Sequence, residues 1–201
     1  MRLRLFFTEL PAESTLNALD RRLSALARSQ EPIDGGRRLW ITHIPETITR
    51  PFLHARAFDL FVSALRFSTA EIEDFRIGIG ATPKRVMICH APDESPESLE
   101  ICFAIAAEVM SRCAALLNIS ESLGKQMFHI KPPLDDEFPS HLLDDFPGSV
   151  YEVAHEKADG DLGLEWFVDA RWLRSWSQQH YRHLQADAHS EVSRFSSLDY
   201  T

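Results

Sequence analysis

One segment near the middle of the chain constrains the fold more than any other. Ser95, Pro96 and Glu97 have the properties of a helix start: a serine oxygen for the N-cap, a proline for the first turn, and a carboxylate beside the positive end of the helix dipole. Apolar residues then recur on one side at helical spacing: Leu99, Cys102, Phe103, Ala106, Met110, Cys113 and Leu117. The pattern predicts a long helix that is more buried than any other in the chain.

Further strands and helices are predicted on both sides of this helix. Strands are expected over residues 2–7, 38–42, 75–79, 85–89, 149–155 and 164–168, and helices over 11–28, 49–65 and 169–184. The strand pairs within 75–89 and 149–168 indicate hairpins. Because 44% of the 201 residues are hydrophobic, we expect one domain over residues 1–201, with a polar tail at 186–201 that frays. The expected fold is α+β, with a mixed or mainly antiparallel sheet and helices packed mostly on one side.

The cysteines and the N-terminal residues indicate in which cellular compartment the protein is expected. Cys102 and Cys113 fall on one predicted helix at a separation of roughly 16 Å, too far apart for a disulfide. Cys89 falls on a predicted strand, so we expect three free, buried thiols in a reducing compartment. The apolar run after the first basic residues is too short for a signal peptide, and no stretch approaches a membrane span. We therefore expect a cytoplasmic protein.

Three fragments invite a chemical interpretation. The pair Gly78 and Gly80 lacks the third glycine of a dinucleotide loop, and we interpret it as part of a hairpin turn. Cys89 and His90 are neighbours in a predicted strand, so their side chains should point to opposite faces and not act together.

His180, His183 and Asp187 share one face near the end of the last predicted helix. Two imidazoles and a carboxylate could hold a metal ion. Alternatively, the histidines are solvated side chains that favour the negative end of a helix. We expect no cofactor.

The net charge of −9 is unevenly distributed. Residues 1–85 carry a balance of +3, residues 86–148 carry −8, and residues 149–201 carry −4. One acidic group opens the long predicted helix: Asp93, Glu94, Glu97 and Glu100. A second lies in the loop 131–148, interleaved with leucines and phenylalanines: Asp135, Asp136, Glu137, Asp144 and Asp145, beside Phe138 and Phe146.

Acidic residues at a helix start are ordinary, whereas acidic pairs beside apolar residues are typical of a binding surface. The loop is either such a surface or simply solvated. Its charge would repel nucleic acid and anionic lipid and would favour a basic protein. The expected partner-binding residues are Asp93, Glu94, Glu97, Asp135, Asp136, Glu137, Phe138, Asp144, Asp145 and Phe146.

Two stretches, FPGSVYEV at 146–153 and WFVDARWLRSW at 166–176, resemble a bacterial domain family of unknown function, as does the helical region 99–124. That family is associated with immunity to polymorphic toxins delivered by contact. The resemblance implies a protein that binds and inhibits a basic toxin domain, and it implies no catalytic residues. Two alternatives stay open: a small metal-dependent hydrolase that uses the C-terminal histidines, and a non-enzymatic scaffold subunit.

Overall fold

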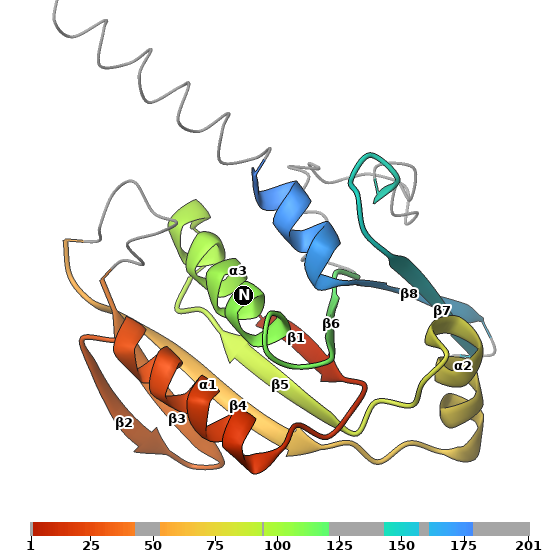
Figure 1. Cartoon of the computed structure of the whole chain (residues 1–201), viewed down its shortest axis with the longest axis horizontal. Coiled ribbons are helices and arrows are strands. Elements are labelled where there is room, and N and C mark those ends of the chain that lie inside the picture. Colours follow the sequence, from red (N-terminus) through yellow and green to blue (C-terminus); the bar gives the residue numbers. More distant parts are fainter. Residues whose placement is uncertain (1, 43–52, 94, 121–142, 157–160, 179–201) are drawn as a thin grey trace, which may run out of the picture.

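Eight strands form a single antiparallel sheet in the computed structural model, which describes residues 2–42, 53–93, 95–120, 143–156 and 161–178 (Figure 1). The strands are β1 (Arg2–Phe7), β2 (Ser29–Ile33), β3 (Gly36–Ile41), β4 (Arg56–Ala64), β5 (Arg85–His90), β6 (Ala115–Asn118), β7 (Val150–Glu156) and β8 (Leu162–Val168). Their order across the sheet is β2-β3-β4-β5-β1-β6-β8-β7. The expected α+β fold with a mainly antiparallel sheet is confirmed.

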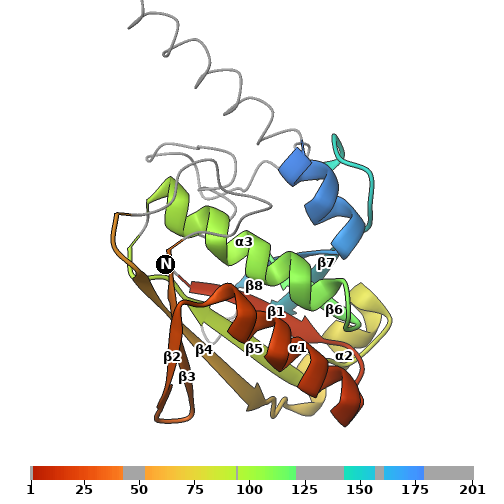
Figure 2. The same cartoon turned by 60° about the vertical axis from the view of Figure 1, so that its left-hand side comes forward.

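The helices divide unequally between the two faces of this sheet (Figures 1 and 2). Helices α1 (Glu13–Leu26) and α3 (Pro96–Met110) and the helix over 170–178 bury their apolar sides in the larger core. Helix α2 (Thr69–Ile79) covers part of the opposite face, where Phe75 packs into a smaller cluster with Phe6 and Phe167. The expectation that helices lie mostly on one side is therefore confirmed.

Helix α3 forms the centre of the larger core. Ile101, Cys102 and Ile105 are fully buried, and the Phe103 ring lies 4.8 Å from that of Trp176. The expected helix start is confirmed, because the Ser95 hydroxyl accepts a hydrogen bond from the Ser98 amide.

The helix ends earlier than its apolar pattern predicts, at Met110. Cys113 and Leu117 lie beyond it, and the run Ala115–Asn118 becomes β6 between β1 and β8. A short apolar run suits a buried helix or a central strand equally well, and here pairing with two strands decides the outcome.

Two of the predicted elements are of the wrong type. Within the predicted helix 49–65, the described part forms strand β4, because Phe58 and Leu60 enter the core with the period of a strand. Residues 75–79 belong to helix α2 and not to a strand. A capping box between Ser68 and Glu71 opens that helix, and Gly80 closes it with φ 71°. The predicted hairpin over 75–89 is therefore wrong, and Gly80 is a helix end.

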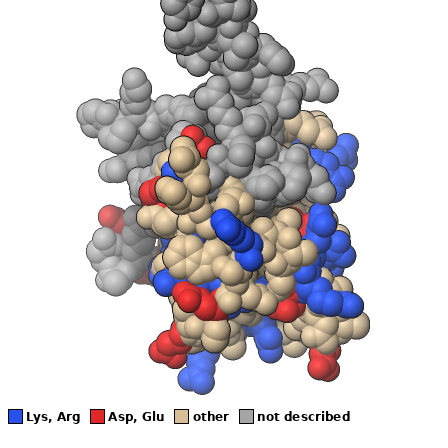
Figure 3. Space-filling model, turned by 90° about the vertical axis from the view of Figure 1, so that its left-hand side faces the viewer, with Lys and Arg blue, Asp and Glu red and all other residues tan. Residues whose placement is uncertain are grey.

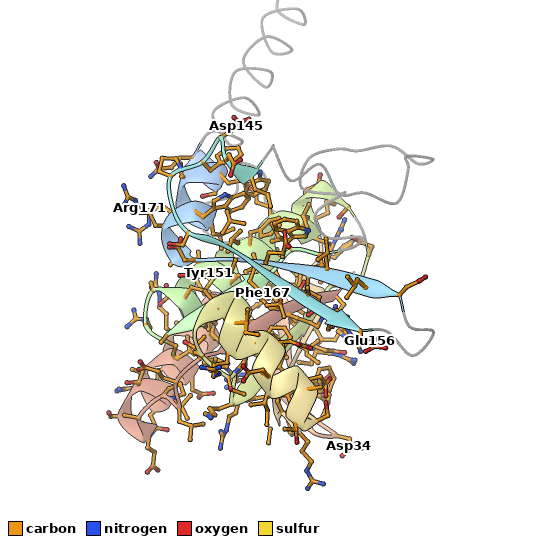
Figure 4. The ribbon with its side chains drawn as sticks, turned by 90° about the vertical axis from the view of Figure 1, so that its right-hand side faces the viewer. Asp34, Asp145, Tyr151, Glu156, Phe167 and Arg171 are labelled. Atoms are coloured by element: carbon orange, nitrogen blue, oxygen red, sulfur yellow. The ribbon has the colours of Figure 1, made fainter. Side chains whose placement is uncertain are left out.

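Close packing of α2 against β7 explains why residue 78 is a glycine. A Cβ atom on Gly78 would lie 2.4 Å from the carbonyl oxygen of Glu152, so only glycine fits there. Figure 4 shows Tyr151 and Phe167 where the β7–β8 hairpin passes α2. This second predicted hairpin, over 149–168, is confirmed by the pairing of β7 with β8.

The remaining expectations for the described residues hold in part. The strands predicted over 2–7, 38–42 and 85–89 and the helix over 11–28 are present, while the edge strand β2 was not predicted. Cys89, Cys102 and Cys113 are free and buried, as expected. None of the helices in the described ranges has the length and apolar character needed to cross a membrane. The tail 186–201 lies outside the described residues.

Candidate binding surface

The structure assigns a structural role to Asp93, the first residue of the expected binding set. Arg56, at the start of β4, donates from Nη1 to the Asp93 carboxylate at 2.7 Å and to the Ser95 hydroxyl at 2.8 Å. Partial burial alone would raise the pKa of Asp93, but hydrogen bonds from Ser95 and the charge of Arg56 lower it to about 2. Asp93 is thus an ionised residue that ties β4 to the start of α3.

Glu97 and Glu100 lie one turn apart on the outer side of α3. Glu97 is exposed, whereas Glu100 is half-buried. Burial raises the pKa of Glu100 to about 7, and the neighbouring charge of Glu97 adds to the increase. Glu108, further along the helix, is paired with Arg22 of α1 at 3.6 Å and with Arg112 at 2.6 Å. The acidic side of α3 is therefore partly neutralised.

The described end of the acidic loop has a mixed character. Asp144 and Asp145 are exposed. Phe146 is half-buried, and its ring lies 5.2 Å from that of Trp172 in an edge contact, so it packs against the core. Trp172 also donates from Nε1 to the Leu143 carbonyl at 2.8 Å. These contacts fix the turn 143–148, while Glu94, Asp135, Asp136, Glu137 and Phe138 lie outside the described residues.

The described acidic residues do not form one patch. The start of α3 and the turn 143–148 lie apart in both views, with the helix over 170–178 between them (Figures 1 and 2). Figure 3 shows acidic side chains scattered over the side that includes the β2–β3 edge, with basic ones along its right-hand margin. The described members of the expected partner-binding set therefore do not lie together on one surface.

Two of the residues considered for chemistry, Cys89 and His90, lie next to each other in β5. Cys89 is fully buried in the larger core and His90 points to the opposite face, as their alternation predicts. Within the described ranges, no three His, Cys, Asp or Glu side chains are grouped so that they could hold a metal ion. His180, His183 and Asp187 lie outside these ranges.

A row of polar and charged side chains crosses the sheet on the face opposite α1 and α3. The strand register places Glu31 opposite Arg38, Arg38 opposite Asp59, Asp59 opposite His90, and His90 opposite Arg2. This polar row therefore runs straight across β2, β3, β4, β5 and β1. Cross-strand neighbours on one face are close enough to interact directly.

Hydrogen bonds connect most of the polar row. Arg38 binds Asp59 with two parallel bonds of 2.6 and 2.9 Å and approaches Glu31 at 3.4 Å. Arg2 donates from Nε to His90 Nε2 at 2.8 Å. The bond from Arg38 lowers the pKa of Asp59, and burial together with the charge of Arg2 lowers the pKa of His90. A neutral His90 is the form that can accept the Arg2 proton donor.

Half-buried aromatic side chains flank the polar row. Trp40 follows Arg38 by two residues on β3, and Phe61 follows Asp59 by two on β4, so all four share one face. The Phe61 ring lies 5.6 Å from that of His90. We call this part of the sheet, over β2, β3, β4, β5 and β1, the open face. Among the described helices only α2 lies on that side. It packs mainly against β7, and its Phe75 also reaches Phe6 of β1, away from the polar row.

The open face could not have been predicted from hydrophobic periodicity and local motifs. Arg2 and Arg38 were assigned to strands, but nothing in a single sequence fixes which residues of distant strands lie opposite each other. Asp59 and Phe61 were placed on a helix, which separated them from His90. One available signal in the sequence was Asp59 between the apolar residues Phe58 and Leu60, which agrees with a half-exposed strand.

The polar row is thus an array of groups on the surface of the sheet, of which Arg38 with Asp59 and Arg2 with His90 are joined by hydrogen bonds. No protein-family model, curated protein or solved structure matches this chain.

Proposed function

We propose that this chain is a cytoplasmic binding protein of the immunity type, which inhibits a basic protein toxin by covering it with the open face of its sheet. The observation that carries the proposal is the polar row with Trp40 and Phe61 beside it, on a face that α1 and α3 leave uncovered. The net charge of −9 would steer a basic partner toward the molecule over long range.

The composition of the open face supports this role. Tryptophan and arginine are the residue types that most often dominate binding energy, and they do so near the centre of an interface. Arg38 is held in place by two bonds to Asp59, so it would lose little freedom when a partner binds. Trp40 and Phe61 would supply apolar contact on both sides of the polar row.

The test uses the product of the gene adjacent to the one that encodes this chain, since an inhibitor of this type is made together with its toxin. The adjacent product alone should arrest the growth of a host cell, and co-expression of this chain should restore growth. The variants Trp40→Ala and Phe61→Ala should lose protection. Ile77→Ala is the matched control, because Ile77 is 73% exposed but lies on α2.

Each protein must remain folded for the comparison to count, so thermal unfolding is measured alongside growth. Protection by Trp40→Ala and Phe61→Ala equal to that of the unchanged chain would contradict the assignment of the open face. An adjacent product that is harmless and does not bind would contradict the proposed function itself.

A further inference from the structure

A pocket of about 430 Å³ lies on the other side of the sheet, between α1 and the strands. Leu16, Leu19 and Leu23 of α1 line one wall, and Leu60 and Met87 lie across from them. The volume falls within the range of about 300–1,000 Å³ that is typical of small-molecule sites. Because the open face is on the opposite side, this pocket is separate from the surface proposed above.

Helix α1 leaves part of the strand surface in this pocket exposed, at Val62. Val62 follows the buried Phe58 and Leu60 at alternate positions of β4, so its side chain points toward the helix-bearing face. It is nevertheless 50% exposed. Apolar area of this kind would favour an apolar ligand that removes it from water.

Among the charged side chains at the rim, one cation has no partner in the described part of the chain. Arg37 and Asp20 form an ion pair, which neutralises both. Arg85 also lines the pocket, on the same face as Met87, and is exposed. It makes no hydrogen bond or ion pair with the described part of the chain. A mainly apolar pocket with a guanidinium at its edge that no described residue pairs suits a ligand with an apolar body and one negative group.

We infer that this pocket binds a small amphiphilic carboxylate, with the alkyl body between α1 and β4 and the carboxylate on Arg85. The arrangement accounts for both features together: burial of the alkyl body covers Val62 and Leu16, and the carboxylate pairs with Arg85, which no described residue does. Hydrogen bonds to charged groups are the stronger kind, so the head group should contribute substantially to affinity.

The experiment titrates the full chain with decanoate, with octanoate and with uncharged decanol by calorimetry. Decanoate should bind saturably with one site, and octanoate should bind about tenfold more weakly because it lacks two methylene groups. Arg85→Gln should weaken decanoate about tenfold and leave decanol unchanged. Arg174→Gln, an exposed arginine on the helix over 170–178, is the matched control and should bind as the unchanged chain does.

Val62→Trp should fill the pocket and abolish binding, and chemical-shift changes in the unchanged chain should locate the ligand at α1 and β4. Decanoate that does not saturate, equal binding of decanoate and decanol, or shift changes confined to other elements would each overturn the inference. The shift map keeps the test decisive if Val62→Trp fails to fold. None of these results bears on the open face, so failure here is distinguishable from failure of the proposed function.

Discussion

Replacing Glu100 with glutamine should stabilise the protein at alkaline pH and not at acid pH. Burial raises the pKa of this carboxyl from its usual 4.5 to about 7, with a contribution from Glu97. The unfolded chain therefore releases the proton at a lower pH than the folded chain does. Stability that depends on this group is fully present below pH 4.5 and is lost as the pH rises through about 7.

The raised pKa of Glu100 also determines the size of the expected effect on stability. A change in pKa from 4.5 to about 7 corresponds to about 3.4 kcal/mol for a fully shielded carboxyl. Because Glu100 is only half-buried, solvent screening reduces the expected cost to about 1–2 kcal/mol. Glutamine has nearly the same shape as glutamate but carries no charge, so Glu100→Gln should recover this free energy above pH 7.

Urea unfolding at pH 5 and pH 8 measures the difference directly. Glu100→Gln should raise the free energy of unfolding by about 1–2 kcal/mol more at pH 8 than at pH 5. Glu97→Gln is the matched control: it removes an exposed charge one turn away and should give a clearly smaller difference between the two pH values. If Glu100→Gln had the same effect at both pH values, the argument from burial would be refuted.

Three further predictions concern stability and association. Gly148→Ala should destabilise the fold by more than about 2 kcal/mol, because Gly148 has a φ of 145° and a Cβ there would lie 2.3 Å from the Trp172 amide nitrogen. A decrease in the free energy of unfolding of less than about 0.5 kcal/mol, measured with urea, would contradict this. His90→Gln should reduce the loss of stability between pH 7 and pH 5. The folded protein favours neutral His90, because its pKa is lowered, and this stabilisation is lost as the pH falls and the imidazole is protonated. An unchanged dependence of the free energy of unfolding on pH would count against this. Reversal of Asp144 and Asp145 to lysine should slow association with the toxin at low salt more than at high salt, and equal rates at both would exclude steering by this turn.

The sequence patterns predicted the elements in which one local signal dominates. Ser95, Pro96 and Glu97 together specify the start of α3, and the alternation in 2–7 specifies β1, because cap chemistry and burial act within a few residues. The wrong predictions lie where helical spacing and strand spacing both fit the same residues. Ala57, Leu60 and Phe61 fit a helical stripe, while Phe58 and Leu60 fit a strand with one buried face. Pairing with β3 and β5 determines that the strand forms.

The candidate surface depends on information that a single sequence does not carry. Arg2 and His90 are 88 positions apart and Arg38 and Asp59 are 21 apart, and each pair meets only through the register of the sheet. The acidic residues, by contrast, are conspicuous in the sequence, yet Asp93 is engaged by Arg56 and Phe146 packs against Trp172. Local composition does not reveal such contacts, and these long-range contacts determine which side chains remain available to a partner.

The most direct test of the open face is site-specific photo-crosslinking in the complex with the toxin. A photoreactive phenylalanine analogue replaces Phe61 on the open face or, in a second protein, Ile77 on the exposed side of α2. The account predicts a covalent product with the toxin from position 61 and none from position 77. Crosslinking from position 77 with none from position 61 would contradict it.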